Sequence, residues 1–388
     1  MPKSVFLDTA IDELRTLVAF DTTSRNSNLE LIDYVEGKLT ALGGWCERIP
    51  SPDGRKANLH AVFGPKVDGG IVLSGHTDVV PVDGQPWTTD PWDLTEKDGL
   101  LYGRGTCDMK GFSACILALA PKIAAADLKR PVHIALSYDE EVGCLGAPSM
   151  IDQFMKGAFK PETVVVGEPT DMKVVTAHKG LFSIIVKLRG KEAHSSLVND
   201  GACAVTHAVP LMNYLVEQAG VMREAAPDDS PFDPRHGTLT IGEVKGGTAL
   251  NILALDAEFG SLMRPCPWDD VHAIAEGLKA RAAQVEARMR EHAPDASVTV
   301  EVRSDVPAFA PEDDGAAERL ARQITGDNST RVVSYGTEAG QFQAAGLSVV
   351  VCGPGSIEQA HQPDEFVTIS QLDQCCVFLD KMTGMMGA

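Results

Sequence analysis

The chain is poor in basic residues and has no long apolar run. Its 388 residues include 34 Lys and Arg against 54 Asp and Glu, which gives a formal net charge of -20 at pH 7. An excess of negative charge of this size repels the phosphate groups of nucleic acids and anionic lipids. This argues against nucleic acid or an anionic membrane as a partner. No stretch of about 18 consecutive apolar residues occurs, so no membrane span is expected.

The cysteines lack the spacing of a zinc finger, and the N-terminus lacks the pattern of a signal peptide. The nine cysteines are odd in number and scattered. Free thiols in a reducing compartment explain them most simply. The first residues, MPKSVFLDTAIDEL, include acidic side chains where a signal peptide would be apolar. We therefore expect the protein to be cytoplasmic.

Hydrophobic patterning predicts a doubly wound α/β sheet. Apolar residues recur at helical spacing over 10–20, 29–42 and 111–126, and strand-like apolar runs cover 57–63 and 71–73. Strands that alternate with helices in this way are typical of a largely parallel sheet with helices on both faces. The length of the chain favours two domains rather than one.

The pattern changes after Thr176, where strands and two long helices follow without the earlier alternation. We predict an inserted α+β sandwich domain at residues 178–303. The catalytic domain is then discontinuous, with residues 1–177 and 304–388. No internal repeat is visible.

Five imidazole or carboxylate side chains occur in short polar or glycine-containing segments. They are His76, Asp108, Glu141, Glu168 and His361. All but Asp108 follow a run of apolar, β-branched residues, as Glu168 follows Val164, Val165 and Val166. Ligands of open α/β sheets bind beyond the carboxyl ends of the strands. The five side chains are therefore predicted to converge at one sheet edge.

The residue types at this edge suit a pair of metal ions. Two imidazoles and three carboxylates mix nitrogen and oxygen ligands, as zinc and its neighbours cobalt and manganese prefer, whereas calcium prefers oxygen alone. Two ions about 3.5–4 Å apart need a shared carboxylate, and Asp108 is its natural source. We predict two divalent ions per subunit, and zinc and cobalt fit equally well.

Two further carboxylates have predicted roles beside the ligands. Glu140 precedes Glu141 and is free to act as general base on the attacking water. Asp78, two residues after His76, is placed to accept a hydrogen bond from that imidazole and to fix its tautomer.

Five segments resemble the metal-binding motifs of one metallohydrolase family: SGHTDVVP, DPWDLTEKDGLLYGRGTCDMKG, YDEEVG, GEPTD and GPGSIEQAHQPDEFV. The family includes aminoacylase, carboxypeptidase G-type enzymes, succinyl-diaminopimelate desuccinylase and acetylornithine deacetylase. The similarity covers nearly the whole chain and keeps the order of the motifs. The segments AHKG, YGTEAGQF and GSIEQAHQPDE are most similar to the acetylornithine deacetylase branch.

The resemblance implies how the ligands divide. His76, Asp108 and Glu168 would hold one metal ion, and Asp108, Glu141 and His361 would hold the other. It also implies that the inserted domain acts as a lid or in dimerisation. In the implied homodimer, His194 reaches the active site of the other subunit and polarises the scissile carbonyl. By itself, a histidine in such a turn after a strand is more often a surface residue than a catalytic one.

Substrate contacts are predicted for Asn251, Arg264 and Glu338. The resemblance implies the first two, and Arg264 would hold an α-carboxylate bidentately. Glu338 is an anion outside the ligand set and would hold a side-chain ammonium group. Its alternative readings are a surface carboxylate in a loop and a neighbour of a helix N-cap.

The implied function is removal of the acetyl group from N2-acetyl-L-ornithine, giving ornithine and acetate for arginine synthesis. Desuccinylation of succinyl-diaminopimelate, or general aminoacylase or dipeptidase activity, stays open within the family. A catalytically inactive binding protein is the alternative from another class. The intact Glu140 and all five ligands argue against it, because an inactive relative does not need them.

Overall fold

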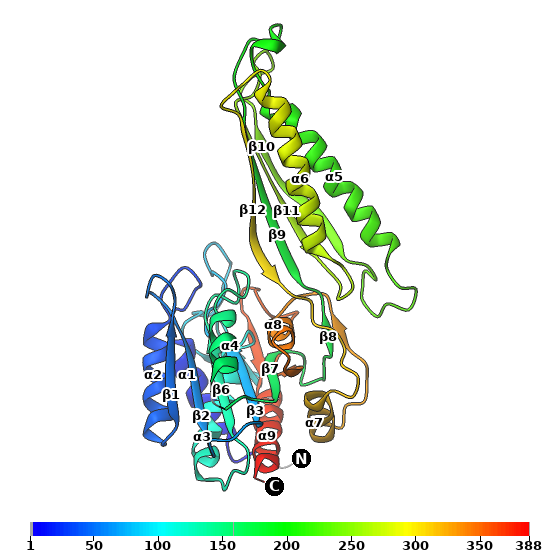
Figure 1. Ribbon diagram of the computed structural model, residues 1–388. Coiled ribbons are helices and arrows are strands. Elements are labelled where there is room, and N and C mark those ends of the chain that lie inside the picture. The colour runs from blue at the N-terminus through cyan, green and yellow to red at the C-terminus, as the bar shows by residue number, and fades with distance from the viewer. Residues whose placement is uncertain (1–2, 158, 388) are drawn as a thin grey trace. The chain divides into compact units, whose positions relative to one another are not determined.

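The computed structural model describes residues 3–157 and 159–387, which form two compact units (Figure 1). The first unit comprises Met1–Ala177, Ala310–Arg331 and Thr337–Ala388, and the second comprises His178–Phe309 and Val332–Gly336. Each has its own hydrophobic core. The sequence predicts that the inserted domain ends at residue 303. The second unit of the structure extends to Phe309, whose main chain pairs with that of His178.

The first unit is built on a six-stranded sheet with the strand order β1-β2-β6-β3-β7-β14. Strands β6, β3, β7 and β14 are parallel to one another, whereas β2 is antiparallel to both β1 and β6. The strands are β1 (Trp45–Pro50), β2 (Ala57–Phe63), β3 (Ile71–His76), β6 (Val132–Ser137), β7 (Thr163–Pro169) and β14 (Ser348–Gly353). Strands β3, β6 and β7 are buried along their whole length, as parallel strands between helical layers require.

Helices cover both faces of this sheet, so the mixed α/β class predicted from the sequence is confirmed (Figure 1). A Cβ atom on Gly75 would meet Met109 and Ser113 near the start of α3, whereas the neighbouring Ser74 faces Glu338 beside α8. Consecutive strand residues point to opposite faces, so α3 and α8 lie on opposite sides. The helices of this unit are α1 (Leu7–Val18), α2 (Leu29–Ala41), α3 (Lys110–Ala125), α4 (Ala147–Lys156), α7 (Ala316–Thr325), α8 (Ala339–Ala344) and α9 (Ile369–Met386).

A small three-stranded sheet joins two segments that are far apart in sequence. Its strands, in the order β15-β5-β4, are β4 (Thr95–Lys97), β5 (Leu100–Tyr102) and β15 (Phe366–Thr368). Phe366 pairs with Tyr102 and Thr368 with Leu100. This pairing sets the chain that precedes Asp108 beside the chain that follows His361.

The second unit is a four-stranded antiparallel sheet with two long helices, and Figure 1 shows both helices along one face of it. The strand order is β10-β11-β9-β12. Its elements are β8 (Ala177–His178), β9 (Leu181–Arg189), η1 (Val198–Asp200), α5 (Ala204–Glu224), β10 (Thr238–Gly246), β11 (Asp256–Arg264), α6 (Val271–Arg290), β12 (Ser297–Val306) and β13 (Val332–Val333). Strand β9 alternates between buried and more accessible residues, because only one of its faces meets the helices.

Within residues 3–157 and 159–387, no helix combines the length and the apolar character that a membrane crossing requires.

Candidate metal centre

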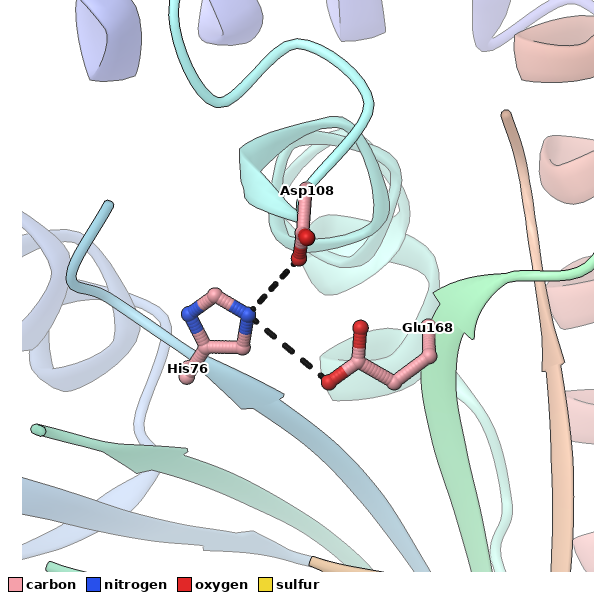
Figure 2. A group of neighbouring side chains, drawn as sticks. All are labelled: His76, Asp108 and Glu168. Carbon is pink, nitrogen blue, oxygen red and sulfur yellow. Dashed lines mark hydrogen bonds and ion pairs between the residues drawn. The ribbon is translucent and has the colours of Figure 1, made fainter. Parts of the chain in front are cut away.

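The first group of candidate ligands lies where two adjacent strands of the first unit end. His76 is the last residue of β3, Glu168 is near the end of β7, and Asp108 lies just before α3. The Nε2 atom of His76 is 2.9 Å from Oδ1 of Asp108 and 3.7 Å from Oε1 of Glu168. Figure 2 shows both carboxylates facing the same nitrogen of the imidazole ring. All three side chains are buried.

Glycine sets the path of the chain beside Glu168. A Cβ atom on Gly167 would lie 2.1 Å from the ring of Phe112 in α3. Any larger residue would therefore push β7 away from α3. The Gly in the sequence GEPT is thus explained by close packing of strand on helix, which places Glu168 beside Asp108.

The second group shares Asp108 with the first. The Nε2 atom of His361 is 2.9 Å from Oε2 of Glu141 and 3.3 Å from Oδ2 of Asp108. One oxygen of Asp108 therefore faces His76, and the other faces His361. The structure brings together all five candidate ligands named from the sequence, in two groups whose ligand atoms lie within 4.8 Å of one another.

Burial and mutual contacts shift the pKa values of this cluster. Burial is the largest single effect on the pKa of His76 and lowers it. The hydrogen bond to Asp108 and the charges of the nearby carboxylates together outweigh burial and raise the pKa well above its usual value. Hydrogen bonds to Asp108 and Glu141 raise the pKa of His361 to about 10. Burial raises the pKa of Glu141 and of Glu168. The carboxylates thus require nearby positive charge, which metal ions would supply while displacing protons from the imidazoles.

The donors in this cluster fit divalent metal ions. Each group offers one imidazole nitrogen and carboxylates from two acidic residues, a mixture that zinc and cobalt accept. The buried Oε1 atom of Glu141 has no hydrogen-bond partner in the part of the chain that the structure describes. Because buried polar atoms are nearly always paired, this oxygen is suited to a further ligand interaction.

Asp78 orients His76 through its main chain rather than through its carboxylate. The Nδ1 atom of His76 lies 2.9 Å from the carbonyl oxygen of Asp78 but 3.7 Å from Oδ1. The carboxylate instead accepts hydrogen bonds from the main-chain amides of Glu140 and Glu141, at 3.1 and 3.2 Å, and from the hydroxyl of Ser24 at 2.7 Å. Asp78 therefore connects the His76 segment to the Glu140–Glu141 segment, a role that the sequence did not indicate.

Glu140 lies beside the ligands in a turn with left-handed residues. The thiol of Cys144 donates a hydrogen bond to Oε1 of Glu140 over 3.2 Å. Both Asp139 and Cys144 have positive φ, at 56° and 52°, and Lys56 pairs with Asp139. Burial raises the pKa of Glu140 to about 7, which suits a group that must accept and release a proton near neutral pH.

Three of the predicted site residues belong to the second unit. His194 is exposed, and its Nδ1 accepts a hydrogen bond from the amide of Ser196 at 3.2 Å. Nδ1 also lies 2.8 Å from the Ser196 hydroxyl. The amide contact favours the tautomer of neutral His194 that carries its proton on Nε2, from where it can donate. Asn251 is next to it, since the amide of Ser195 donates to the Asn251 carbonyl. Arg264 is the last residue of β11.

Glu338 is at the N-cap position of α8, and its side chain is closed off from solvent, with 1% of the residue exposed. Burial raises its pKa to about 7, although the hydroxyls of Ser137 and Ser74 face the carboxylate and counteract this rise. Of the two alternative readings of the sequence, this location agrees with the one beside a helix N-cap and not with a surface carboxylate. The burial shows that Glu338 offers no open surface to a ligand in this conformation.

Comparison with known proteins places this architecture in a family. The profile of peptidase family M20/M25/M40 matches residues 72–383, a span that contains all five candidate ligands. The chain belongs to this family. It is therefore a dinuclear metallohydrolase that acts on amide bonds, as the sequence motifs implied.

Full-length relatives carry a more specific name. An acetylornithine deacetylase of Myxococcus xanthus is 37% identical over 375 residues, 93% of each chain. One of Pasteurella multocida is 32% identical over 386 residues, which cover 99% of this chain and 98% of the relative.

Solved structures share the fold at low sequence identity. The M20 metallo-carboxypeptidase Sso-CP2 of Sulfolobus solfataricus is similar with a TM-score of 0.75 and 16% identity, over 97% of this chain and 99% of that one. The aminopeptidase PepT of Bacillus cereus gives a TM-score of 0.72 and 18% identity, over 98% and 99% of the two chains. These likenesses concern the fold alone.

Proposed function

We propose that the protein removes the acetyl group from N2-acetyl-L-ornithine and releases ornithine and acetate, in the synthesis of arginine. Near-full-length similarity to proteins named acetylornithine deacetylase, at 32–37% identity, carries this proposal. The first unit supplies a site of the required kind, because its two ligand groups share one carboxylate.

In this proposal, His76, Asp108 and Glu168 hold one divalent ion, and Asp108, Glu141 and His361 hold the other. Zinc or cobalt suits these ligands. When bound, the ions would polarise the amide carbonyl and make a water molecule acidic near neutral pH. The hydrogen bond from Nδ1 of His76 to the Asp78 carbonyl orients the ring so that Nε2 can bind the ion.

Glu140 acts as the general base and then as the general acid. Its carboxylate takes one proton from the attacking water while the water oxygen bonds to the carbonyl carbon. The C–N bond then breaks, and Glu140 gives the proton to the departing amine nitrogen. The amides bonded to Asp78 fix the main chain of Glu140, and the Cys144 thiol orients its carboxylate.

His194 stabilises the negative charge that develops on the carbonyl oxygen, by donating from Nε2. We propose that it does so in the active site of the other subunit of a homodimer, with the second unit as the lid and dimerisation domain. The Ser196 amide supports this role, because its hydrogen bond to Nδ1 favours the tautomer with the proton on Nε2.

Arg264 and Asn251 bind the α-carboxylate end of the substrate in this proposal. Glu338 holds the ammonium group at the other end, which requires the N-terminus of α8 to open, since the carboxylate is buried. Acetylornithine carries both charges, so this pair of contacts would distinguish it from acylated amino acids with neutral side chains.

The test is product formation by zinc- or cobalt-reconstituted protein on a small substrate panel. The panel contains acetylornithine, succinyl-diaminopimelate, acetylmethionine and an unmodified dipeptide. The proposal predicts the highest kcat/KM on acetylornithine. A higher value on another member would transfer the function to that substrate, and no metal-dependent turnover on any of them would favour an inactive binding protein.

A further inference from the structure

A buried ion pair lies outside the set of candidate ligands. Arg104 and Glu365 meet through Nη1 and Oε2 at 2.6 Å, and each side chain is 1% exposed. An ion pair so thoroughly removed from water is costly unless further hydrogen bonds satisfy both groups. The hydrogen-bond partners of these two side chains therefore indicate the role of the ion pair.

The carboxylate of Glu365 holds the main chain at Asp108. Its Oε1 atom accepts hydrogen bonds from the amides of Cys107 and Asp108, at 2.9 and 3.1 Å. The amide of Gly103 also donates to the Glu365 carbonyl, at 3.0 Å. Glu365 thus fixes the peptide units on which the shared carboxylate stands.

The guanidinium of Arg104 extends the network to His361. Its Nη2 atom donates to Oε1 of Gln85 at 2.6 Å, and the Nε2 atom of Gln85 donates to the carbonyl of His361 at 2.9 Å. Arg104 also lies over the ring of Trp87, 5.1 Å from its centre. His361 has a φ of 64°, a left-handed conformation that a residue with a side chain adopts only when its surroundings enforce it.

The two ligand groups differ in how they are supported. His76 and Glu168 belong to buried strands, whose ladders of main-chain hydrogen bonds fix them. His361 stands in a loop, and its side chain is 49% exposed. Its position therefore depends on contacts from outside its own segment, and the Gln85 amide supplies one of them directly.

We infer that Arg104, Glu365 and Gln85 are positioning residues for the metal centre, and that Gln85 acts selectively on the Asp108–Glu141–His361 group. This inference rests on the proposed metal centre. Loss of a residue that orients a ligand typically lowers metal affinity by about 10–100-fold. The loss caused by changing Gln85 should fall on one of the two ions, because only one group contains His361. A change at Glu365 should weaken both, because Asp108 is shared.

The test is zinc binding to metal-free protein, measured by competition with a chelator and by metal analysis. Gln85→Glu keeps an oxygen for Arg104 but removes the amide that donates to His361. Its added negative charge would by itself favour a cation, so a loss of affinity cannot be ascribed to charge. Thr88→Val is the matched control, because the Thr88 hydroxyl donates to Asp364 between the same two loops without touching a ligand.

The expected result is a wild-type protein with two bound ions and a Gln85→Glu protein in which one ion binds about 10–100-fold more weakly. Glu365→Gln should weaken both ions, and Thr88→Val should weaken neither. Unchanged binding by Gln85→Glu, equal weakening of both ions, or the same loss in Thr88→Val would overturn the inference. A wild-type protein that binds fewer than two ions would instead contradict the proposed metal centre.

Discussion

At the residue scale, Asp108 and Glu140 define the chemistry of the site. The two oxygens of Asp108 face different histidines, so one side chain can serve both metal ions. Glu140 is next to the candidate ligand Glu141, yet it belongs to neither ligand group, and its carboxylate accepts a hydrogen bond from the thiol of Cys144. The proposed role of Glu140 as a base rather than a ligand leads to the first prediction.

Glu140→Gln should lower kcat by about 10²–10⁴-fold, the usual effect of removing a general base. The amide has nearly the same shape as the carboxyl group but cannot accept the proton. Metal analysis should still find two ions per chain, because the five ligands are unchanged. Parallel loss of metal and of turnover would show that Glu140 supports the metal centre instead.

Glu338→Gln and Arg264→Ala should have different effects on two substrates. Glu338→Gln should reduce kcat/KM for acetylornithine far more than for acetylmethionine, which has no side-chain charge. Arg264→Ala should impair both, because both substrates have an α-carboxylate. Truncating one partner of a desolvated charge pair costs on the order of 2–5 kcal/mol. An equal loss for the two substrates in Glu338→Gln would remove Glu338 from the specificity pocket.

At the scale of elements, the sequence predicts the helices and strands that a pattern of apolar residues within their own segment marks. The apolar run Val164–Val166 marks a buried strand, and the residues that follow it lie at its carboxyl end. The six-residue helix α8 is too short for a helical repeat to be visible. The contacts of Asp78 and of Glu365 depend on segments brought together only by folding, so no local pattern could indicate them.

Strands β2 and β6 also carry a pair of histidines that should make stability depend on pH. The Nε2 atom of His60 lies 2.9 Å from Nδ1 of His133. Burial lowers the pKa of His60 to about 3 and that of His133 to about 4. The unfolded chain, with ordinary pKa values near 6.5, therefore binds more protons than the folded one as the pH falls.

The free energy of unfolding should consequently decrease below about pH 6.5, by up to roughly 1.4 kcal/mol per pH unit for each histidine. The decrease should end near the folded pKa values. Urea titrations at pH 7 and pH 5 measure it, with a His60→Phe/His133→Leu variant as the control that cannot titrate there. If the variant loses as much stability as the wild type between these pH values, the pair is not responsible.

At the scale of the whole molecule, the proposed site needs residues from both units. The metal ligands and Glu140 belong to the first unit, and His194 belongs to the second. If His194 acts in the other subunit, His194→Ala and Glu140→Gln proteins should each be nearly inactive. Mixing them under conditions of subunit exchange should restore activity, because one site in each hybrid dimer regains both groups. Hybrid dimers without activity would exclude action across subunits.

The most direct measurement of the central claim is acetate release from acetylornithine as metal-free protein is titrated with zinc or cobalt. The account predicts negligible turnover without metal, a rise as ions are added, and a maximum at about two ions per chain, since two ligand groups are present. Ornithine and acetate should form in equal amounts. Turnover that survives complete removal of metal, or fully loaded protein that leaves acetylornithine intact, would contradict the account.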